Sequence, residues 1–279
     1  MNTRKLALWI RQHLAKLLLV VFIILPALSF VVGSAAILAY IFWPIDSSRM
    51  TMPLVNPDAG NIVVLVHGLN DNSSSWGTTL KQNFENQLSL EREISQVIAL
   101  DWKPYSENAL RCSVDGKRIG ALLGKQMARS TRLKSVHLVG HSCGSFVILG
   151  VCEALKTERS EILVQSTYLA PVNIYGGIFW NYGSSHFGDC ADFSDAYIDR
   201  EDTIGISRKA PTNTYGFDIT DMRIGSEIAV SPHIWPTVYY QQLVKSGTYP
   251  DLNNDTQLST KLPLGNLEHL IDTPVSSMQ

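Results

Sequence analysis

The stretch from residue 17 to residue 43 is predominantly apolar and contains no Lys, Arg, Asp or Glu. At ~1.5 Å per helical residue it spans roughly 40 Å, more than the ~30 Å hydrocarbon core of a bilayer requires. It is also longer than the ~7–15-residue apolar core of a cleavable signal peptide. Residues 17–43 therefore predict an uncleaved transmembrane signal anchor, with a cleaved signal or a buried soluble helix as the alternatives.

Charges on either side of this stretch indicate its orientation. Four cations precede it (Arg4, Lys5, Arg11 and Lys16), whereas Asp46 and Arg49 offset each other just after it. The positive-inside rule then predicts a cytoplasmic N-terminus, residues 1–16, and a remainder on the periplasmic or extracytoplasmic side. Removing those four cations from 23 Lys and Arg leaves 19 against 25 Asp and Glu. The resulting surplus of acidic residues argues against a nucleic-acid partner.

The remainder is long enough for one domain. Residues 44–60 contain three prolines and a glycine and predict a linker, which leaves 61–279 as the folded domain. Within it, short aliphatic runs alternate with segments of helical period, which favours an α/β fold with a mostly parallel sheet and helices on both faces. The predicted strands lie at 62–66, 94–102, 136–139, 167–169 and 196–198, and the predicted helices at 76–90, 118–127, 143–155 and 237–244.

Two regions interrupt this alternation. Residues 173–191 combine glycines with aromatic residues, and 203–232 contain turn formers and little helical period. Long loops in compact domains are often functional, so 173–191 is either a lid or substrate-binding loop or an irregular packed insertion.

The pentapeptide Gly140–Gly144 reads G-H-S-C-G and matches G-x-S-x-G between a predicted strand and a predicted helix. A nucleophile on such a sharp turn needs small neighbours, and the start of the helix directs free N–H groups towards an oxyanion. This context predicts Ser142 as a nucleophile. The alternative is a glycine-rich turn with an inert serine.

A nucleophilic serine needs a base, and in this class of fold the chain order is Ser, acid, His. Three histidines follow Ser142. His186 precedes the candidate acids, His269 lies in a polar tail, and His233 lies in a loop before a predicted helix. We therefore predict His233 as the base.

The acid is expected just past the C-terminal end of the strand at 196–198, on the same sheet edge as Ser142. Asp202 precedes a Thr-Ile-Gly turn and is the preferred candidate. The alternatives that remain open are Asp199, Asp195, Asp192 and Glu201.

The transition state also needs oxyanion donors. Gly68 permits a tight turn after the first strand, so we predict the amides of Leu69 and Cys143 as the two donors. His67 is expected to hydrogen-bond within its loop.

Several of these segments resemble the pancreatic-lipase-like branch of the α/β-hydrolases. They are Val-His-Gly-Leu at 66–69, Ala-Leu-Asp-Trp-Lys at 99–103, Arg-Ile-Gly at 118–120 and Val-His-Leu-Val-Gly-His-Ser-Cys-Gly at 136–144. The resemblance implies an α/β-hydrolase fold, Ser142 as nucleophile, the Leu69 and Cys143 amides as oxyanion hole, and ester substrates. Where those lipases place their acid, residues 169–173 contain no carboxylate, so the acid is expected from the next strand.

The cysteines give a weaker expectation. Cys143 and Cys152 lie on one predicted helix, ~13 Å apart by rise, and cannot bond to each other. Cys112 and Cys190 are then the pair expected in an oxidising compartment. No metal-ligand spacing is present, and neither a metal nor a cofactor is expected.

Together these features predict a membrane-anchored serine hydrolase that cleaves a carboxylic ester, small or lipid. The alternatives are thioester or amide cleavage on the same residues, and a non-catalytic, membrane-anchored interaction domain with this fold.

Overall fold

The computed structural model describes residues 3–89, 93–206, 208–250 and 262–270, and divides into two compact units, Met1–Pro44 and Ile45–Gln279. In the first unit, helix α1 (Thr3–Leu19), a π-helical turn η1 (Val20–Ile24) and helix α2 (Leu25–Phe42) follow one another without a break. Pro26 lies in the first turn of α2, where it has no N–H to donate to the carbonyl four residues earlier. The stretch Arg11–Phe42 is long and apolar enough to cross a membrane.

The second unit is built on a seven-stranded sheet in which all paired strands are parallel. The strand order is β2-β1-β3-β4-β5-β6-β7. The strands are β1 (Asn61–Val66), β2 (Ser95–Leu100), β3 (Ser135–His141), β4 (Leu163–Leu169), β5 (Phe193–Ile198), β6 (Tyr215–Asp218) and β7 (Leu267–His269).

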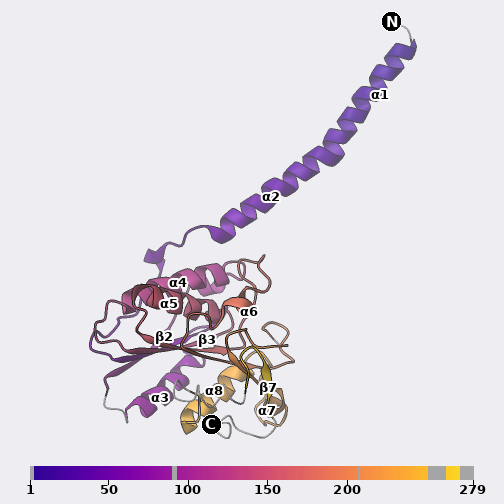
Figure 1. Cartoon of the computed structure of the whole chain (residues 1–279). Helices are drawn as coiled ribbons and strands as arrows, with labels where there is room; N and C mark the ends of the chain where they lie inside the picture. The colour runs from indigo at the N-terminus through magenta and orange to yellow at the C-terminus, as the bar shows by residue number, and fades with distance from the viewer. Residues whose placement is uncertain (1–2, 90–92, 207, 251–261, 271–279) are drawn as a thin grey trace. The chain divides into compact units, whose positions relative to one another are not determined.

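Helices cover both faces of the sheet (Figure 1). Helices α4 (Cys112–Met127) and α5 (Gly144–Glu158) pack together on one face, and α3 (Gly77–Leu88) and α8 (Trp235–Ser246) on the other. Short helical segments complete the unit: η2 (Ser47–Arg49), η3 (Tyr105–Glu107), α6 (Tyr182–His186) and α7 (Thr220–Ile224). The structure thus confirms the predicted α/β class and its mostly parallel sheet.

Strand β1 shows why a continuous apolar run forms a central strand. Ile62, Val64 and Val66 belong to the core under α4 and α5, whereas Val63 and Leu65 belong to the core under α3 and α8. Successive side chains point to opposite faces of a strand, so a strand covered on both faces needs apolar residues throughout.

Several boundaries differ from the prediction. Strands β6 and β7 were not predicted, and α4 begins at Cys112, six residues before the predicted start at Arg118. Strand β6 is four residues long and contains a glycine and an aspartate, which are rare in strands.

The expected linker over 44–60 is packed against the sheet domain from Ile45 onwards. Met50 and Ala59 are buried in the core under α4 and α5. The backbone also accepts hydrogen bonds from the domain, since Gln126 Nε2 donates to the Pro53 carbonyl and Ser130 Oγ to the Pro57 carbonyl. This segment therefore belongs to the folded domain.

The expected cysteine pairing is wrong. Cys112 is bonded to Cys143 and Cys152 to Cys190. Because α4 and α5 lie side by side, the start of α4 is next to the start of α5, where Cys143 is the N-cap residue. The second bond ties α5 to the end of the 173–191 loop.

We expect the Cys112–Cys143 disulfide to stabilise the domain by about 3–4 kcal/mol, the loop-entropy value for a closed loop of this length. The two cysteines are 31 residues apart, and the bond restricts the unfolded chain. Urea unfolding of a Cys112→Ala, Cys143→Ala variant, in parallel with wild type, measures the difference. Equal midpoints and slopes for the two proteins would contradict the prediction.

Candidate active site

Ser142 lies on the sharp turn between β3 and α5, at the C-terminal edge of the sheet. Its φ of 53° is in the left-handed region, which non-glycine residues rarely occupy. The other described non-glycine residues with positive φ are Asn70, after β1, and Ala170, after β4. All three follow the C-terminal ends of neighbouring strands, and strained backbone of this kind gathers at functional sites.

Close contacts explain one glycine of this turn, Gly144, and one of the facing loop after β1, Gly68. A Cβ on Gly144 would lie 2.6 Å from the Val66 carbonyl oxygen, and one on Gly68 would lie 2.8 Å from the Ser142 Cβ. Real side chains do not approach so closely. The loop after β1 therefore lies directly against Ser142 because both positions lack a side chain.

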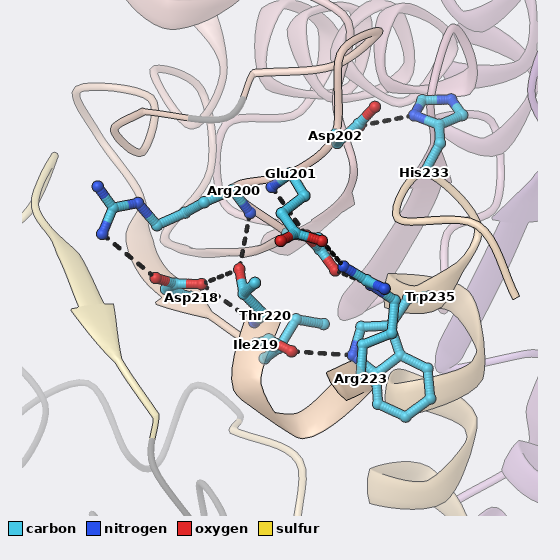
Figure 2. A network of polar contacts seen from close by, with 10 residues as sticks. Arg200, Glu201, Asp202, Asp218, Ile219, Thr220, Arg223, His233 and Trp235 are labelled. Atoms are coloured by element: carbon cyan, nitrogen blue, oxygen red, sulfur yellow. Dashed lines mark hydrogen bonds and ion pairs between the residues drawn. The ribbon is translucent and has the colours of Figure 1, made fainter. Parts of the chain in front are cut away.

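His233 and Asp202 lie beside Ser142, as the sequence predicted. The His233 Nε2 atom is 2.8 Å from Ser142 Oγ. On the other side of the ring, His233 Nδ1 is 2.7 Å from Asp202 Oδ2, a contact that Figure 2 shows. A carboxylate only accepts hydrogen bonds, so Nδ1 carries the hydrogen and Nε2 is left to accept from the serine hydroxyl. The geometry required of a nucleophile, a base and an orienting acid is therefore present.

Asp202 is held in its charged form. Burial raises its pKa, but hydrogen bonds from His233 and from the Ile204 and Gly205 amides outweigh that effect, so its pKa lies below the ordinary value. The turn Asp202–Gly205 thus does two things: it directs the carboxylate at His233 and supplies backbone donors that keep the carboxylate ionised.

The alternative acids have other partners. Asp199 is fully buried and accepts from Arg223 Nε at 2.6 Å. The same guanidinium pairs with Glu201 (Figure 2). Asp192 accepts from Lys156 Nζ and from the Val164 amide.

Asp195 is fully buried in β5 and accepts from Thr167 Oγ1 at 2.6 Å. Within the described part of the chain its Oδ2 atom has no hydrogen-bond partner. Burial raises the pKa of Asp195 to about 7. This carboxyl group lies inside the sheet domain and has no contact with His233 among the described hydrogen bonds.

We expect Asp195 to make the domain less stable as the pH rises. With a folded pKa of about 7 against an unfolded value of 3.8, the folded state holds a proton that the unfolded state releases between these values. The free energy of unfolding should therefore fall from about pH 4 to about pH 7, at up to ~1.4 kcal/mol per pH unit, and level off above. Urea unfolding of Asp195→Asn should show a shallower decline over this window, and an unchanged slope would contradict the assignment.

The loop after β1, which was expected to supply one oxyanion donor, lies against Ser142. In the described residues the Leu69 and Cys143 amides donate no hydrogen bond to another group, while the next amide, that of Asn70, donates to the Ser106 carbonyl. His67 contacts Gly68 O through Nδ1 and Asp101 through Nε2, and its carbonyl accepts from the Trp102 indole. His67 thus bonds within its own loop, as predicted, and also to the segment after β2, which was not predicted.

His141, the second residue of the G-x-S-x-G pentapeptide, is a residue of the site that sequence reasoning did not single out. It is buried, and its Nε2 atom is 3.0 Å from the His233 carbonyl oxygen. The sequence offered one signal, a histidine at the end of a mostly buried strand, directly before Ser142.

The other two candidate histidines lie elsewhere. His186 stacks on Tyr182 in α6, and His269 contacts Asp218 and Asp221, hydrogen bonds that raise its pKa. Among the residues that the structure describes, no group of three or more His, Cys, Asp or Glu is placed to hold a metal ion.

The 173–191 loop is packed at its base and exposed at its tip. Phe187 stacks on Tyr168 and is fully buried, whereas Ile178, Phe179 and Trp180 are exposed by 45%, 51% and 67%. The loop is therefore a packed insertion with an apolar tip open to its surroundings.

No family model matches this sequence, and no curated protein matches it. Among solved structures, a lipase-esterase related protein from Clostridium acetobutylicum is 19% identical over 42% of this chain and 44% of its own, with a TM-score of 0.30. A hydrolase from Oleispira antarctica is 15% identical over 40% of this chain and 38% of its own (TM-score 0.25). A gene product from Listeria innocua is 10% identical over 80% of this chain and 89% of its own, with a TM-score of 0.39.

The chain spans less than half the length of the first two of these structures. At such identities the likeness concerns the fold alone. The parallel sheet, its two helical layers and the strand–turn–helix at Ser142 give the chain an α/β-hydrolase-like fold.

Proposed function

We propose that this protein is a serine hydrolase that cleaves carboxylic esters through Ser142, His233 and Asp202. The observation that carries the proposal is the continuous hydrogen-bonded arrangement from Ser142 Oγ through the His233 ring to Asp202, with contacts of 2.8 and 2.7 Å. An inert serine on a glycine-rich turn needs no such partners, whereas a nucleophile does.

The chemistry follows from these contacts. His233 Nε2 takes the hydroxyl proton as Ser142 Oγ attacks the ester carbonyl, and Asp202 stabilises the imidazolium that forms. The Leu69 and Cys143 amides donate to the oxyanion. His233 then gives its proton to the leaving alkoxide, which departs as an alcohol. Water, deprotonated by His233, attacks the acyl group and releases it as a carboxylic acid with Ser142 restored.

Features outside the triad support an ester with an apolar acyl part at a membrane. The stretch Arg11–Phe42 has the length and composition of a transmembrane segment. The exposed tip of the 173–191 loop offers apolar side chains to a lipid-like substrate. Two disulfides favour an oxidising compartment, in agreement with a catalytic domain on the periplasmic or extracytoplasmic side. Membership of the pancreatic-lipase-like branch is part of this proposal.

A fluorophosphonate probe tests the proposal directly, because it labels an activated serine and spares an inert one. We expect full-length protein in detergent to be labelled at one site, Ser142, as identified by peptide mass spectrometry. Absence of labelling in folded protein would favour the non-catalytic interaction domain.

A substrate panel on the same preparation separates the chemistries. Matched butyryl esters, thioesters and anilides share one acyl group and differ in the leaving atom. We expect the ester to have the highest kcat/KM, and a higher value for the thioester or the anilide would reassign the reaction.

A further inference from the structure

His141 packs against the candidate base. Its ring centroid is 4.9 Å from that of His233, and its Nε2 atom is 3.0 Å from the His233 carbonyl oxygen. Because a carbonyl only accepts, His141 Nε2 carries the hydrogen and donates it, which fixes the tautomer. The other ring nitrogen, Nδ1, is then an acceptor.

This tautomer leaves a buried polar atom without a partner. In the described part of the chain, His141 Nδ1 has no hydrogen bond, although the side chain is almost fully buried. A Cβ placed on Gly68 would lie 3.1 Å from it, so the loop after β1 closes over the ring. Buried unsatisfied acceptors are destabilising, and one that persists in a folded protein calls for an explanation.

The geometry points to a positioning role: we propose that His141 holds the His233 main chain through its Nε2–H and so keeps the His233 ring between Ser142 and Asp202. The inference rests on the proposed function. The His233 side chain is bound at both nitrogens, but its backbone lies in a loop between α7 and α8. A donor from the end of β3, one residue before Ser142, ties that loop to the strand that carries the nucleophile.

The charge of His141 suits this role. Burial, and next the neighbouring His233, lower the pKa of His141 to about 4, so it is neutral near pH 7. During catalysis His233 becomes a cation, and a second cation beside it would oppose that step. A lysine or arginine would also donate to the carbonyl, but it would carry a charge at the place where the imidazolium forms.

Two substitutions of His141 separate the loss of its donated hydrogen bond from the loss of its buried ring. His141→Gln puts an amide N–H three bonds beyond Cβ, at the level of the imidazole Nε2, whereas His141→Asn places it one bond short. Since a 1 Å misplacement costs up to ~10²-fold, we expect His141→Asn to lower kcat roughly 10–100-fold with KM changed less than about twofold. His141→Gln should retain kcat within about threefold of wild type. His137→Asn, which removes a partly buried imidazole from the same strand, controls for the loss of a ring from β3.

The measurement uses full-length protein in detergent and a butyryl ester, together with the same variants in an Asp202→Asn background. There His233 already lacks the tautomer that accepts the proton of Ser142, so its positioning no longer limits kcat and His141→Asn should have little further effect. Equal losses in His141→Gln and His141→Asn, or the full His141→Asn loss repeated in the Asp202→Asn background, would overturn the proposal, because either result indicates a general structural effect.

A second readout does not require turnover. The Nδ1 proton that His233 shares with Asp202 gives a low-field proton resonance in selectively ¹⁵N-histidine-labelled protein. It should persist in His141→Gln and His137→Asn and be lost in His141→Asn, and its survival in His141→Asn would overturn the proposal. If wild type hydrolyses no ester, the proposed function fails, while this resonance still decides whether His141 positions His233.

Discussion

Ser142→Ala is expected to lower the turnover of a short-chain ester by about 10⁶-fold, the loss seen when a serine hydrolase of this type is deprived of its nucleophile. Alanine keeps the Cβ and removes only the Oγ that lies 2.8 Å from His233 Nε2. The contacts that form the turn are made by the backbone and by glycines, so the domain should stay folded.

Ser145→Ala is the matched control for this prediction. Ser145 is fully buried three residues further along, and within the described residues its hydroxyl has no hydrogen-bond partner. Its removal should change kcat by less than about twofold, because no contact with the reacting atoms is lost. Thermal melting of both variants verifies folding. Turnover of a folded Ser142→Ala protein above ~1% of wild type would exclude the serine mechanism.

The parts of the fold that could be predicted from sequence are those with a strong local pattern. Strand β1 is a continuous apolar run from Ile62 to Val66 because both faces of the sheet are covered, and α5 has helical spacing directly after a G-x-S-x-G turn. Strands β6 and β7 have four and three residues and lie at one edge of the sheet. Their conformation depends on pairing with the rest of the sheet. Such long-range pairing leaves no pattern in the local sequence.

The site was predictable to the extent that topology brings its parts to one edge. Because parallel strands end at the same edge, residues after β3 and β5 were expected near each other, and Ser142 and Asp202 are both in contact with His233. Their catalytic roles stay predictions. The lateral packing of α4 on α5 could not be inferred, so the wrong cysteines were paired, and the contact of His141 with His233 joins residues 92 positions apart.

Asp202→Asn is expected to lower kcat by about 10⁴-fold, because an amide in place of the carboxylate holds the imidazole in the wrong tautomer. Asp202 accepts from His233 Nδ1 at 2.7 Å and from two backbone amides. An asparagine keeps at most one acceptor oxygen for three donors, and its N–H₂ group would push His233 towards the tautomer that carries hydrogen on Nε2. That nitrogen could then no longer accept the proton of Ser142.

Asp199→Asn separates this effect from the loss of any buried carboxylate. Asp199 lies three residues upstream and pairs with Arg223 at 2.6 Å, so its replacement removes a partly buried ion pair and should lower the melting temperature. We expect kcat to stay within about threefold of wild type, since Arg223 and Asp199 make no contact with His233 among the described hydrogen bonds. The reverse result, a loss of several orders of magnitude in Asp199→Asn and near-normal kcat in Asp202→Asn, would place the acid three residues upstream.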